Sequence, residues 1–246
     1  MPDPLPHYLI NLDRSTDRLN EFMATNGHLR DVIRFQAFDG AKLDRGDLAS
    51  RGILKQDVPY SSGAVGCAMS HIALWKMAAS SENGFTVSED DAIFSRAFPT
   101  RAREILAMLP ANWDIMLWGW NFDAYVWLDV LPGVAGTTQM IFDQEALRTG
   151  IDQFQDLAVH RVPMRLRHGF GTICYSLSPK GAQSLLGRCL PINAPLIAFP
   201  GLEITIDNYG IDATLNGAYP HIEAYACMPP LVVTKNHKES STVLGQ

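Results

Sequence analysis

Residues 85–91 read FTVSEDD, a short run of β-forming residues that ends directly in three consecutive carboxylates, Glu89, Asp90 and Asp91. The turn pair Asn83-Gly84 ends a helical pattern before this run, and residues 99–109 have the spacing of another helix after it. Strand, acidic turn and helix in this order are typical of a protein in which helices cover a sheet. The sequence therefore predicts an α/β fold around this unit.

The alternation of strands and helices extends to both sides of the acidic turn. Apolar runs rich in β-formers predict strands, and apolar residues at helical spacing predict helices. Strands are expected at residues 7–12, 32–37, 113–120, 169–178 and 232–234, and helices at 15–27, 64–80 and 182–186, the last opened by Pro179. Residues 41–63 and 123–167 show neither pattern, and we expect loops or insertions there.

The composition excludes several classes of protein. Of the 246 residues 47% are apolar, enough to bury a sizeable core, which excludes a disordered or fibrous protein. The net charge of −6 leaves no basic surplus for a phosphate backbone, so nucleic acid is not an expected partner. No apolar run approaches the ~20 residues that cross a bilayer.

The start of the chain and its cysteines indicate a compartment. Residues 1–4 have neither the basic start nor the apolar core of a secretory signal, which favours a protein that is not exported. The four cysteines are far apart and lack the spacing of zinc ligands, so we expect reduced thiols in the core. The protein is therefore expected to be cytoplasmic and at most peripheral to a membrane.

The acidic triplet is the sharpest candidate site. Three adjacent carboxylates repel one another unless water or a cation neutralises them. If the strand continues through the triplet, Glu89 and Asp91 face a cleft at the carboxyl edge of the sheet while Asp90 turns away. Hard oxygen ligands of this kind suit Mg²⁺ or Mn²⁺ bound to a diphosphate. The alternative is a solvated acidic turn that caps the following helix.

Other candidates have weaker patterns. Arg14 and Arg18 are four residues apart and share a helical face if the helix begins early, where they could grip a phosphate or a base; alternatively, they are surface charges. Ser70 and His71 lie inside an apolar helix, the usual place for packed core residues. Glycines at 63, 66, 169 and 171 allow backbone to approach a ligand, although none completes a phosphate-loop or dinucleotide fingerprint.

Two later carboxylates, Asp207 and Asp212, lie in a segment with the character of a loop. Either of them could exchange a proton with a substrate, and either could be a simple surface residue. The pattern of the sequence does not choose between these interpretations.

Taken in chain order, these features resemble glycosyltransferase family 25, which includes bacterial lipooligosaccharide galactosyltransferases and collagen galactosyltransferases. The resemblance covers most of the chain because several motifs occur in the family's order. They are residues 8–14 (YLINLDR) with Asp17 and Arg18, 37–40 (AFDG), 63–71 (GAVGCAMSH) with Leu74 and Trp75, 89–91 (EDD), Gly171 and Thr172 with Tyr175, 178–182 (SPKGA), and 229–232 (PPLV).

The resemblance implies a GT-A-like single domain of Rossmann type, with a mostly parallel sheet flanked by helices. Residues 1–234 would form the transferase domain, and 235–246 a polar tail. Residues 121–168 match no family motif, so we expect a variable insertion there that includes the acceptor region.

The resemblance also implies roles for individual residues. Glu89 and Asp91 would hold Mn²⁺ or Mg²⁺, and Asp90 would lie with the nucleotide of a UDP-sugar. The other donor-binding residues would be Asn11, Arg14, Arg18, Ser70, His71, Gly171 and Thr172. Asp212 corresponds best to a later family aspartate and would be the catalytic base, with Asp207 as its competitor.

By this resemblance, the chain would be an inverting glycosyltransferase that moves a sugar, galactose in the first instance, from a UDP-sugar to a saccharide hydroxyl. The acceptor would be a glycan or lipid-linked saccharide of lipopolysaccharide or lipooligosaccharide synthesis, met at the inner face of a membrane.

Two departures from the family pattern keep alternatives open. Ala64 stands where the family usually has a glutamate, and Ser88 where it has an aliphatic residue. The first departure allows a catalytically impaired nucleotide-sugar-binding or scaffold protein on the same fold. A metal-dependent phosphohydrolase on an unrelated α/β fold is the other alternative.

Overall fold

Nine strands form the central sheet of the computed structural model, which describes residues 4–193, 196–199 and 203–235. Their order across the sheet is β2-β1-β3-β9-β5-β12-β8-β6-β7. The bounds are β1 His7–Asn11, β2 Val32–Gln36, β3 Phe85–Glu89, β5 Ile115–Gly119, β6 Val126–Asp129, β7 Thr138–Met140, β8 Val162–His168, β9 Cys174–Leu177 and β12 Ala224–Met228.

Most strands of this sheet run in one direction. Parallel pairs join β1 to β2, β1 to β3, and β5 to β12. Strand β9 is antiparallel to both β3 and β5, so these two also share one direction. Strand β8 is antiparallel to both β12 and β6, so β6 runs in the same direction as β12, and β7 is antiparallel to β6. Among the described strands, β7, β8 and β9 therefore run in the reverse direction. The predicted α/β fold of Rossmann type, with a mostly parallel sheet flanked by helices, is confirmed.

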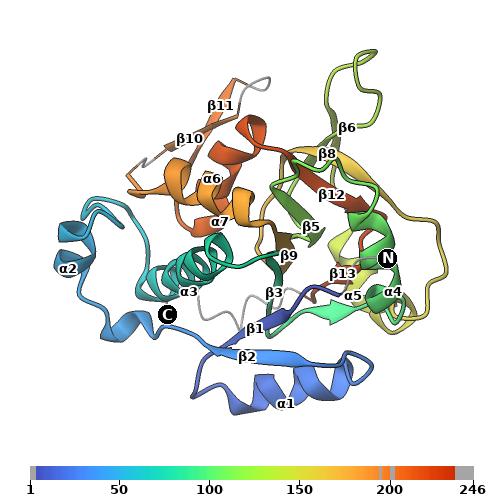
Figure 1. Ribbon diagram of the computed structural model, residues 1–246, viewed down its shortest axis with the longest axis horizontal. Helices are drawn as coiled ribbons and strands as arrows, with labels where there is room; N and C mark the ends of the chain where they lie inside the picture. Colours follow the sequence, from blue (N-terminus) through green and yellow to red (C-terminus); the bar gives the residue numbers. More distant parts are fainter. Residues whose placement is uncertain (1–3, 194–195, 200–202, 236–246) are drawn as a thin grey trace.

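Helices cover both faces of the sheet (Figure 1). Helices α3, α6 and α7 pack against one another on one face, and α1 and α4 lie on the other. The helix bounds are α1 Thr16–Thr25, α2 Arg45–Ser50, α3 Ser62–Ala79, α4 Phe98–Leu106, α5 Gln144–Phe154, α6 Pro179–Cys189 and α7 Ile211–Ala218, with 3₁₀ turns η1 Gly40–Lys42 and η2 Tyr219–His221. No helix in the described ranges has the length and apolar character needed to span a membrane.

The alternation of side chains along the strands creates one hydrophobic core on each face. In β5, Ile115 and Leu117 join the core beneath α3, α6 and α7, whereas Met116 and Trp118 join the core beneath α1 and α4. All four side chains are fully buried. A strand buried on both faces reads as a continuous apolar run, which explains why β5 could be predicted from sequence.

Two small strand pairs complete the fold. Strands β10 (Leu196–Phe199) and β11 (Ile204–Asp207) form an antiparallel hairpin beside α7. Strands β4 (Ile93–Phe94) and β13 (Val232–Val233) also pair, with Val233 opposite Ile93. The second pair brings the end of the described chain beside the acidic turn.

The two segments expected to be loops contain regular structure. Residues 41–63 hold α2, whose first turn is capped by Asp44 accepting from the backbone N–H of Gly46 at 2.7 Å. Residues 123–167 hold β6, β7, α5 and most of β8, and β8 pairs with β12 in the main sheet. Helix α2 and strands β6 and β7 have too few residues to show a period, so their structure depends on contacts distant in sequence. Helix α5 has eleven residues and an amphipathic pattern, which sequence reasoning missed.

Several predicted boundaries also shift. Helix α3 ends at Ala79, before the Asn83-Gly84 turn, and α6 continues to Cys189. Strand β9 begins at Cys174 and not at residue 169. Gly171 has a φ of +88°, a conformation that residues in a regular strand do not adopt. The predicted polar tail falls on residues 235–246, of which only Lys235 is described.

Two buried histidines predict a loss of stability in mild acid. His7 is 8% exposed and bonds to Ser88 Oγ at 2.7 Å, and His168 packs edge-on against Trp127. Burial lowers the pKa of each to about 4, whereas an unfolded histidine titrates near 6.5. The unfolded chain therefore binds more protons below about pH 6.5, and the free energy of unfolding falls until about pH 4.

For His7 alone this loss amounts to about 2 kcal/mol by about pH 5. Urea denaturation of the parent and of His7→Gln at about pH 7 and about pH 5 measures it, since glutamine does not titrate. We expect a smaller acid loss in the variant. Equal losses in both proteins would show that His7 does not contribute.

Candidate active site

The acidic turn and the end of β1 lie at one edge of the sheet. Strands β1 and β3 are parallel neighbours with Ile10 opposite Glu89, so their carboxyl ends place Asn11 beside the acidic triplet. A cavity opens here, which we call the site cavity. It is lined by β1, α1, residues 37–41, α3 and the acidic turn, and the predicted site residues on its walls are Asn11, Arg14, Arg18, Ser70, His71, Glu89 and Asp90. Ligands of open α/β sheets bind at edges of this kind.

Asp90 does not turn away from the site, which corrects the alternation expected from a continued strand. Strand β3 ends at Glu89, and Asp90 and Asp91 belong to the turn that follows. Asn11 Nδ2 donates to Asp90 Oδ2 at 2.7 Å, and Arg18 forms an ion pair with Asp90 Oδ1. Asp90 therefore fixes Arg18 and Asn11 in the wall of the site cavity.

Asp91 faces a neighbouring cavity on the other side of Asp90. Its side chain is 42% exposed and lies 3.9 Å from Arg18 Nη2. Thr234 Oγ1 donates to Asp91 Oδ2 at 3.3 Å, a contact that depends on the pairing of β13 with β4. Asp90 and Arg18 line both cavities, so the acidic turn forms the partition between them. Thr234 carries no signal in the sequence that marks it as a site residue.

Glu89 is held by two side chains from different elements. Thr172 Oγ1 donates to Glu89 Oε1 at 2.5 Å, and His71 Nε2 lies 3.5 Å from the same oxygen. His71 is fully buried in α3, and Thr172 lies just before β9. The structure thus brings together the predicted site residues His71, Glu89 and Thr172.

The site carries more acidic than basic groups. Partial desolvation of the 42%-exposed side chain and the neighbouring charge of Glu89 raise the pKa of Asp91 to about 6, and burial raises the pKa of Asp90. Burial would raise the pKa of Glu89 as well, but contacts from His71, Thr172 and Arg18 hold it below its ordinary value. The three carboxylates together raise the pKa of Arg18 despite its burial. This negative excess favours a bound cation.

Asp212 is connected to the same cluster, whereas Asp207 is not. Asp212 lies in the first turn of α7 and accepts from the backbone N–H of Gly171 at 3.1 Å and of Ala213 at 2.9 Å. Gly171 precedes Thr172, so Asp212 is linked to Glu89 through two adjacent residues. Burial raises the pKa of Asp212. Asp207 is exposed in β11 and accepts from the Tyr209 hydroxyl at 2.5 Å.

Two glycines build the wall of the site cavity opposite the acidic turn. A Cβ on Gly66 would lie 2.5 Å from Phe38 O and 2.7 Å from Gly40 N, so the 37–41 segment rests directly on α3. Ser70 Oγ accepts from the Phe38 N–H at 2.9 Å and donates to Gly66 O at 2.8 Å. The fully buried Ser70 thus holds the wall in place, and Arg14 on the rim pairs with Asp39 at 2.6 Å.

Arg14 and Arg18 do not share a helical face, because α1 begins at Thr16. Arg18 is in the helix, whereas Arg14 precedes it. Sequence reasoning also missed Arg34 of β2, whose Nε donates to Asn11 Oδ1 at 3.0 Å and orients the amide that binds Asp90. Arg34 lies in the strand next to β1, and only the strand pairing reveals the contact.

Two sets of side chains could hold a metal ion. Glu89 and Asp91 offer the hard oxygens that Mg²⁺ or Mn²⁺ prefers, but Glu89 lines the site cavity whereas Asp91 lines the neighbouring one. Donor atoms of Cys67, His71 and Glu89 also lie within 4.8 Å of one another. A thiol and an imidazole suit softer ions such as Zn²⁺, whereas Mg²⁺ and Mn²⁺ prefer carboxylate oxygens.

Comparison with known proteins assigns the chain to a family. The family model described as "Glycosyltransferase family 25 (LPS biosynthesis protein)" matches residues 5–203, which include the acidic turn and the whole of α3. A "Glycosyltransferase 25 family member" of Aedes aegypti is 32% identical over 124 residues, covering 46% of this chain and 20% of that protein. A protein of the same name from Anopheles gambiae is 31% identical over 124 residues, covering 46% and 21%.

The chain thus spans about a fifth of the length of these two curated relatives. The family model, in contrast, covers most of the chain. The chain belongs to glycosyltransferase family 25.

Proposed function

We propose that this chain is an inverting glycosyltransferase that moves a sugar, galactose in the first instance, from a UDP-sugar to a saccharide hydroxyl. The observation that carries this proposal is the convergence of Asn11, Arg18 and three carboxylates at the carboxyl edge of β1 and β3. Family membership supports a sugar nucleotide as donor. A nucleoside diphosphate needs cations around it, and the negative excess at the acidic turn is suited to recruit one.

On the donor side, Arg14 and Arg18 line the site cavity and would contact the nucleotide with Asn11 and Asp90. Glu89 and Asp91 would hold Mn²⁺ or Mg²⁺. The ion would stabilise the negative charge that develops on the departing diphosphate. Ser70 and Gly66 would shape the cavity wall, and Gly171 and Thr172 would position Glu89 and Asp212.

On the acceptor side, Asp212 would serve as the catalytic base. The acceptor hydroxyl oxygen forms a bond to the anomeric carbon while the bond from that carbon to the diphosphate breaks, and the hydroxyl proton passes to the Asp212 carboxylate. Two backbone N–H groups orient this carboxylate, and burial raises its pKa, which strengthens it as a base. Asp207 is the weaker candidate because it is exposed in the β10–β11 hairpin.

The acceptor would be a glycan or lipid-linked saccharide of lipopolysaccharide or lipooligosaccharide synthesis, met at the cytoplasmic face of a membrane. Within the proposed transferase domain, residues 1–234, we place the acceptor region in residues 121–168. The β6–β7 hairpin projects from the body of the molecule there (Figure 1) and exposes Leu131 and Val134. Exposed apolar side chains at a loop tip are suited to contact a lipid carrier.

A scaffold protein that binds a nucleotide sugar without turnover is the alternative. Ala64, where the family usually has a glutamate, is 1% exposed in the first turn of α3. The chain therefore places a buried methyl group where a carboxylate is expected. Family membership rules out the phosphohydrolase alternative, which required an unrelated fold.

Thermal unfolding with UDP, in the presence and absence of Mn²⁺, tests the proposed donor site. A ligand at a hundred times its dissociation constant adds roughly 2.7 kcal/mol of stability, or about 5 to 11 °C in a chain of this size. We expect this shift only when UDP and Mn²⁺ are both present. The absence of a shift at saturating concentrations would contradict the proposed donor site.

Turnover separates the enzyme from the scaffold. A screen of radiolabelled UDP-sugars against saccharide acceptors should give transfer of one sugar. The scaffold would be favoured if UDP stabilises the protein but no donor is transferred and none is slowly hydrolysed.

A further inference from the structure

A chain of buried polar groups runs from the centre of the sheet to Glu89. Trp75 Nε1 donates to the Tyr175 hydroxyl at 2.9 Å, and the same hydroxyl lies 2.9 Å from His71 Nδ1. Trp75 and His71 are one turn apart in α3, and Tyr175 comes from β9. All three side chains are fully buried. The proposed function does not use Trp75 or Tyr175.

Hydrogen-bond accounting assigns the tautomer of His71. An indole N–H can only donate, so the Tyr175 oxygen accepts from Trp75. Burial raises the pKa of Tyr175 well above its ordinary value, so the hydroxyl keeps its proton. Among the described residues, the remaining partner of that proton is His71 Nδ1. Nδ1 therefore accepts, which leaves the ring hydrogen of His71 on Nε2.

Glu89 is the charged neighbour of Nε2, although the contact between them is too long for a hydrogen bond. His71 Nε2 lies 3.5 Å from Glu89 Oε1, and Thr172 donates to the same oxygen at 2.5 Å. Both contacts lie on Oε1, and in the described structure no hydrogen bond reaches Oε2. Glu89 lines the site cavity, so this second oxygen is left for a ligand.

We propose that Tyr175, supported by Trp75, is a positioning residue that fixes the Nε2–H tautomer of His71 and thereby orients Glu89 with Oε2 toward the site cavity. This inference rests on the proposed function for the importance of Glu89. The tautomer itself is independent of that function. With the other tautomer, the lone pair of Nε2 would face the carboxylate and repel it.

The first test reads the tautomer in the ligand-free protein. Long-range ¹H–¹⁵N NMR distinguishes a protonated from an unprotonated ring nitrogen, and His71→Gln identifies the signals of His71. We expect Nε2 protonated and Nδ1 unprotonated near neutral pH. A protonated Nδ1 would overturn the proposal, whatever the protein binds.

The second test compares two buried tyrosines. Tyr175→Phe removes the hydroxyl that bonds to His71, whereas Tyr219→Phe removes a buried hydroxyl that has no hydrogen-bond partner among the described residues. The readout is the Mn²⁺ concentration that gives half of the UDP-dependent thermal shift. Loss of an outer partner of a metal ligand typically weakens metal binding by about 10- to 100-fold. We expect this change in Tyr175→Phe and none in Tyr219→Phe.

The outcomes separate the two proposals. An unchanged Mn²⁺ requirement in Tyr175→Phe, or an equal change in both variants, would overturn the positioning role. If the parent protein shows no UDP-dependent shift, the proposed donor site fails, and the NMR measurement alone decides the tautomer. If Tyr175→Phe does not fold, the spectrum of the parent protein still tests the assignment.

Discussion

Asp91→Ala is expected to abolish sugar transfer, with kcat/KM at least about 10³-fold below that of the parent, while the ligand-free protein remains folded. Removing a group that stabilises transition-state charge costs about 10²- to 10³-fold, and the loss of a metal ligand adds to this. Asp91 is the most exposed of the three carboxylates and makes only the long contacts to Thr234 and Arg18.

The fold should tolerate this change for an electrostatic reason. Partial desolvation and the charge of Glu89 raise the pKa of Asp91 to about 6, so its negative charge is unfavourable in the ligand-free protein. Alanine removes a repulsive charge, and the melting temperature without ligand should not fall. The UDP-dependent and Mn²⁺-dependent shift should disappear.

Asp57→Ala is the matched control, because Asp57 is an exposed carboxylate far along the chain from the acidic turn. It should keep both transfer and the thermal shift. Activity near the parent level in Asp91→Ala would show that Asp91 holds no catalytic ion, and the assignment of the acidic turn would be wrong.

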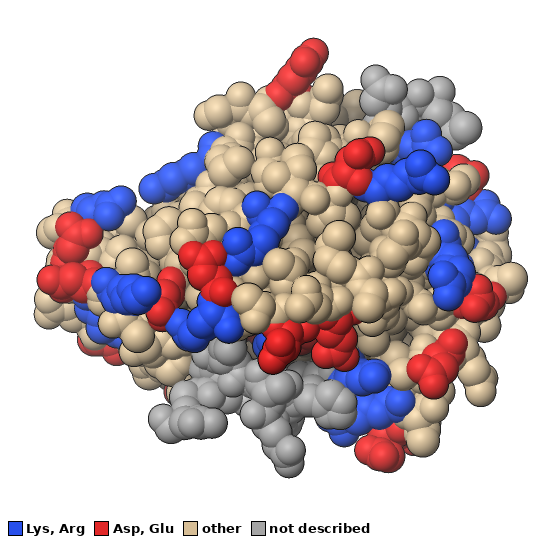
Figure 2. Space-filling model, turned by 90° about the horizontal axis from the view of Figure 1, so that it is seen from below, with Lys and Arg blue, Asp and Glu red and all other residues tan. Residues whose placement is uncertain are grey.

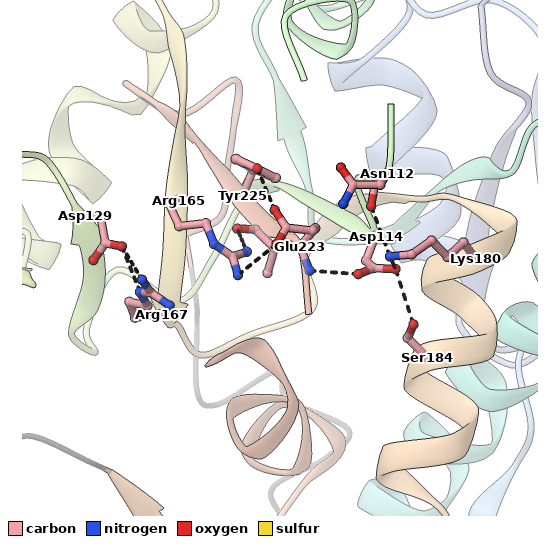
Figure 3. A network of polar contacts seen from close by, with 10 residues as sticks. Asn112, Asp114, Asp129, Arg165, Arg167, Lys180, Ser184, Glu223 and Tyr225 are labelled. Atoms are coloured by element: carbon pink, nitrogen blue, oxygen red, sulfur yellow. Dashed lines mark hydrogen bonds and ion pairs between the residues drawn. The ribbon is translucent and has the colours of Figure 1, made fainter. Parts of the chain in front are cut away.

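Asp114→Ala is expected to lower the free energy of unfolding by about 3 kcal/mol, the second large effect. Asp114 precedes β5 and is 1% exposed. Figure 3 shows its carboxylate meeting Lys180 and Ser184 of α6 and the backbone before β12. Lys180 Nζ lies 2.7 Å from Oδ1, Ser184 Oγ donates to Oδ1 at 3.3 Å, and the Glu223 N–H donates to Oδ2 at 2.7 Å.

Alanine at position 114 leaves the Glu223 N–H and the Ser184 hydroxyl without their acceptor. Lys180 is half exposed, so water can solvate its charge, and the expected loss lies at the low end for a broken buried pair. Thermal unfolding should show a decrease of about 6 to 12 °C. Asp156→Ala is the control, because the pair of Asp156 with Arg96 is exposed and such pairs contribute about 1 kcal/mol or less.

Asp114 lies before the start of β5, at the edge of the sheet opposite the acidic turn. If Asp114→Ala folds, it should therefore keep the UDP-dependent thermal shift. A melting temperature equal to that of the parent would show that the contacts in Figure 3 do not stabilise the fold.

The charged side chains on the surface seen in Figure 2 are mixed in sign. Figure 2 shows acidic and basic side chains interspersed over the face seen from the side of α1 and β2. Mixed charges of this kind are typical of a solvated surface. The candidate site is therefore the site cavity and not a surface patch.

The local pattern of the sequence was enough to locate the elements that carry the site. Strands β1, β3 and β5 are compact apolar runs, and α3 has apolar residues on most of its surface. Their composition alone therefore indicates that these elements are buried. The sequence also places polar residues where two of these strands end, Asn11 at the end of β1 and the acidic triplet at the end of β3. Parallel strands then bring those ends to one edge.

The elements between residues 121 and 168 were not predicted. Strand β6 has four residues and β7 three, too short to show a period. The amphipathic pattern of α5 and the alternation of Met164 and Leu166 with arginines in β8 are signals that sequence reasoning missed. The structure of the three strands comes from pairing with β12 and with one another.

By itself the sequence determined the α/β class, the acidic turn and the helix that carries Ser70 and His71, because each depends on neighbours within a few residues. Only the tertiary structure decided that Asp90 binds Asn11 and Arg18, that Asp212 and not Asp207 accepts from the backbone of Gly171, and that Tyr175 reaches His71. The partners in these contacts are 41 to 104 residues apart in the sequence. Such contacts depend on strand order and direction, and no local period encodes these.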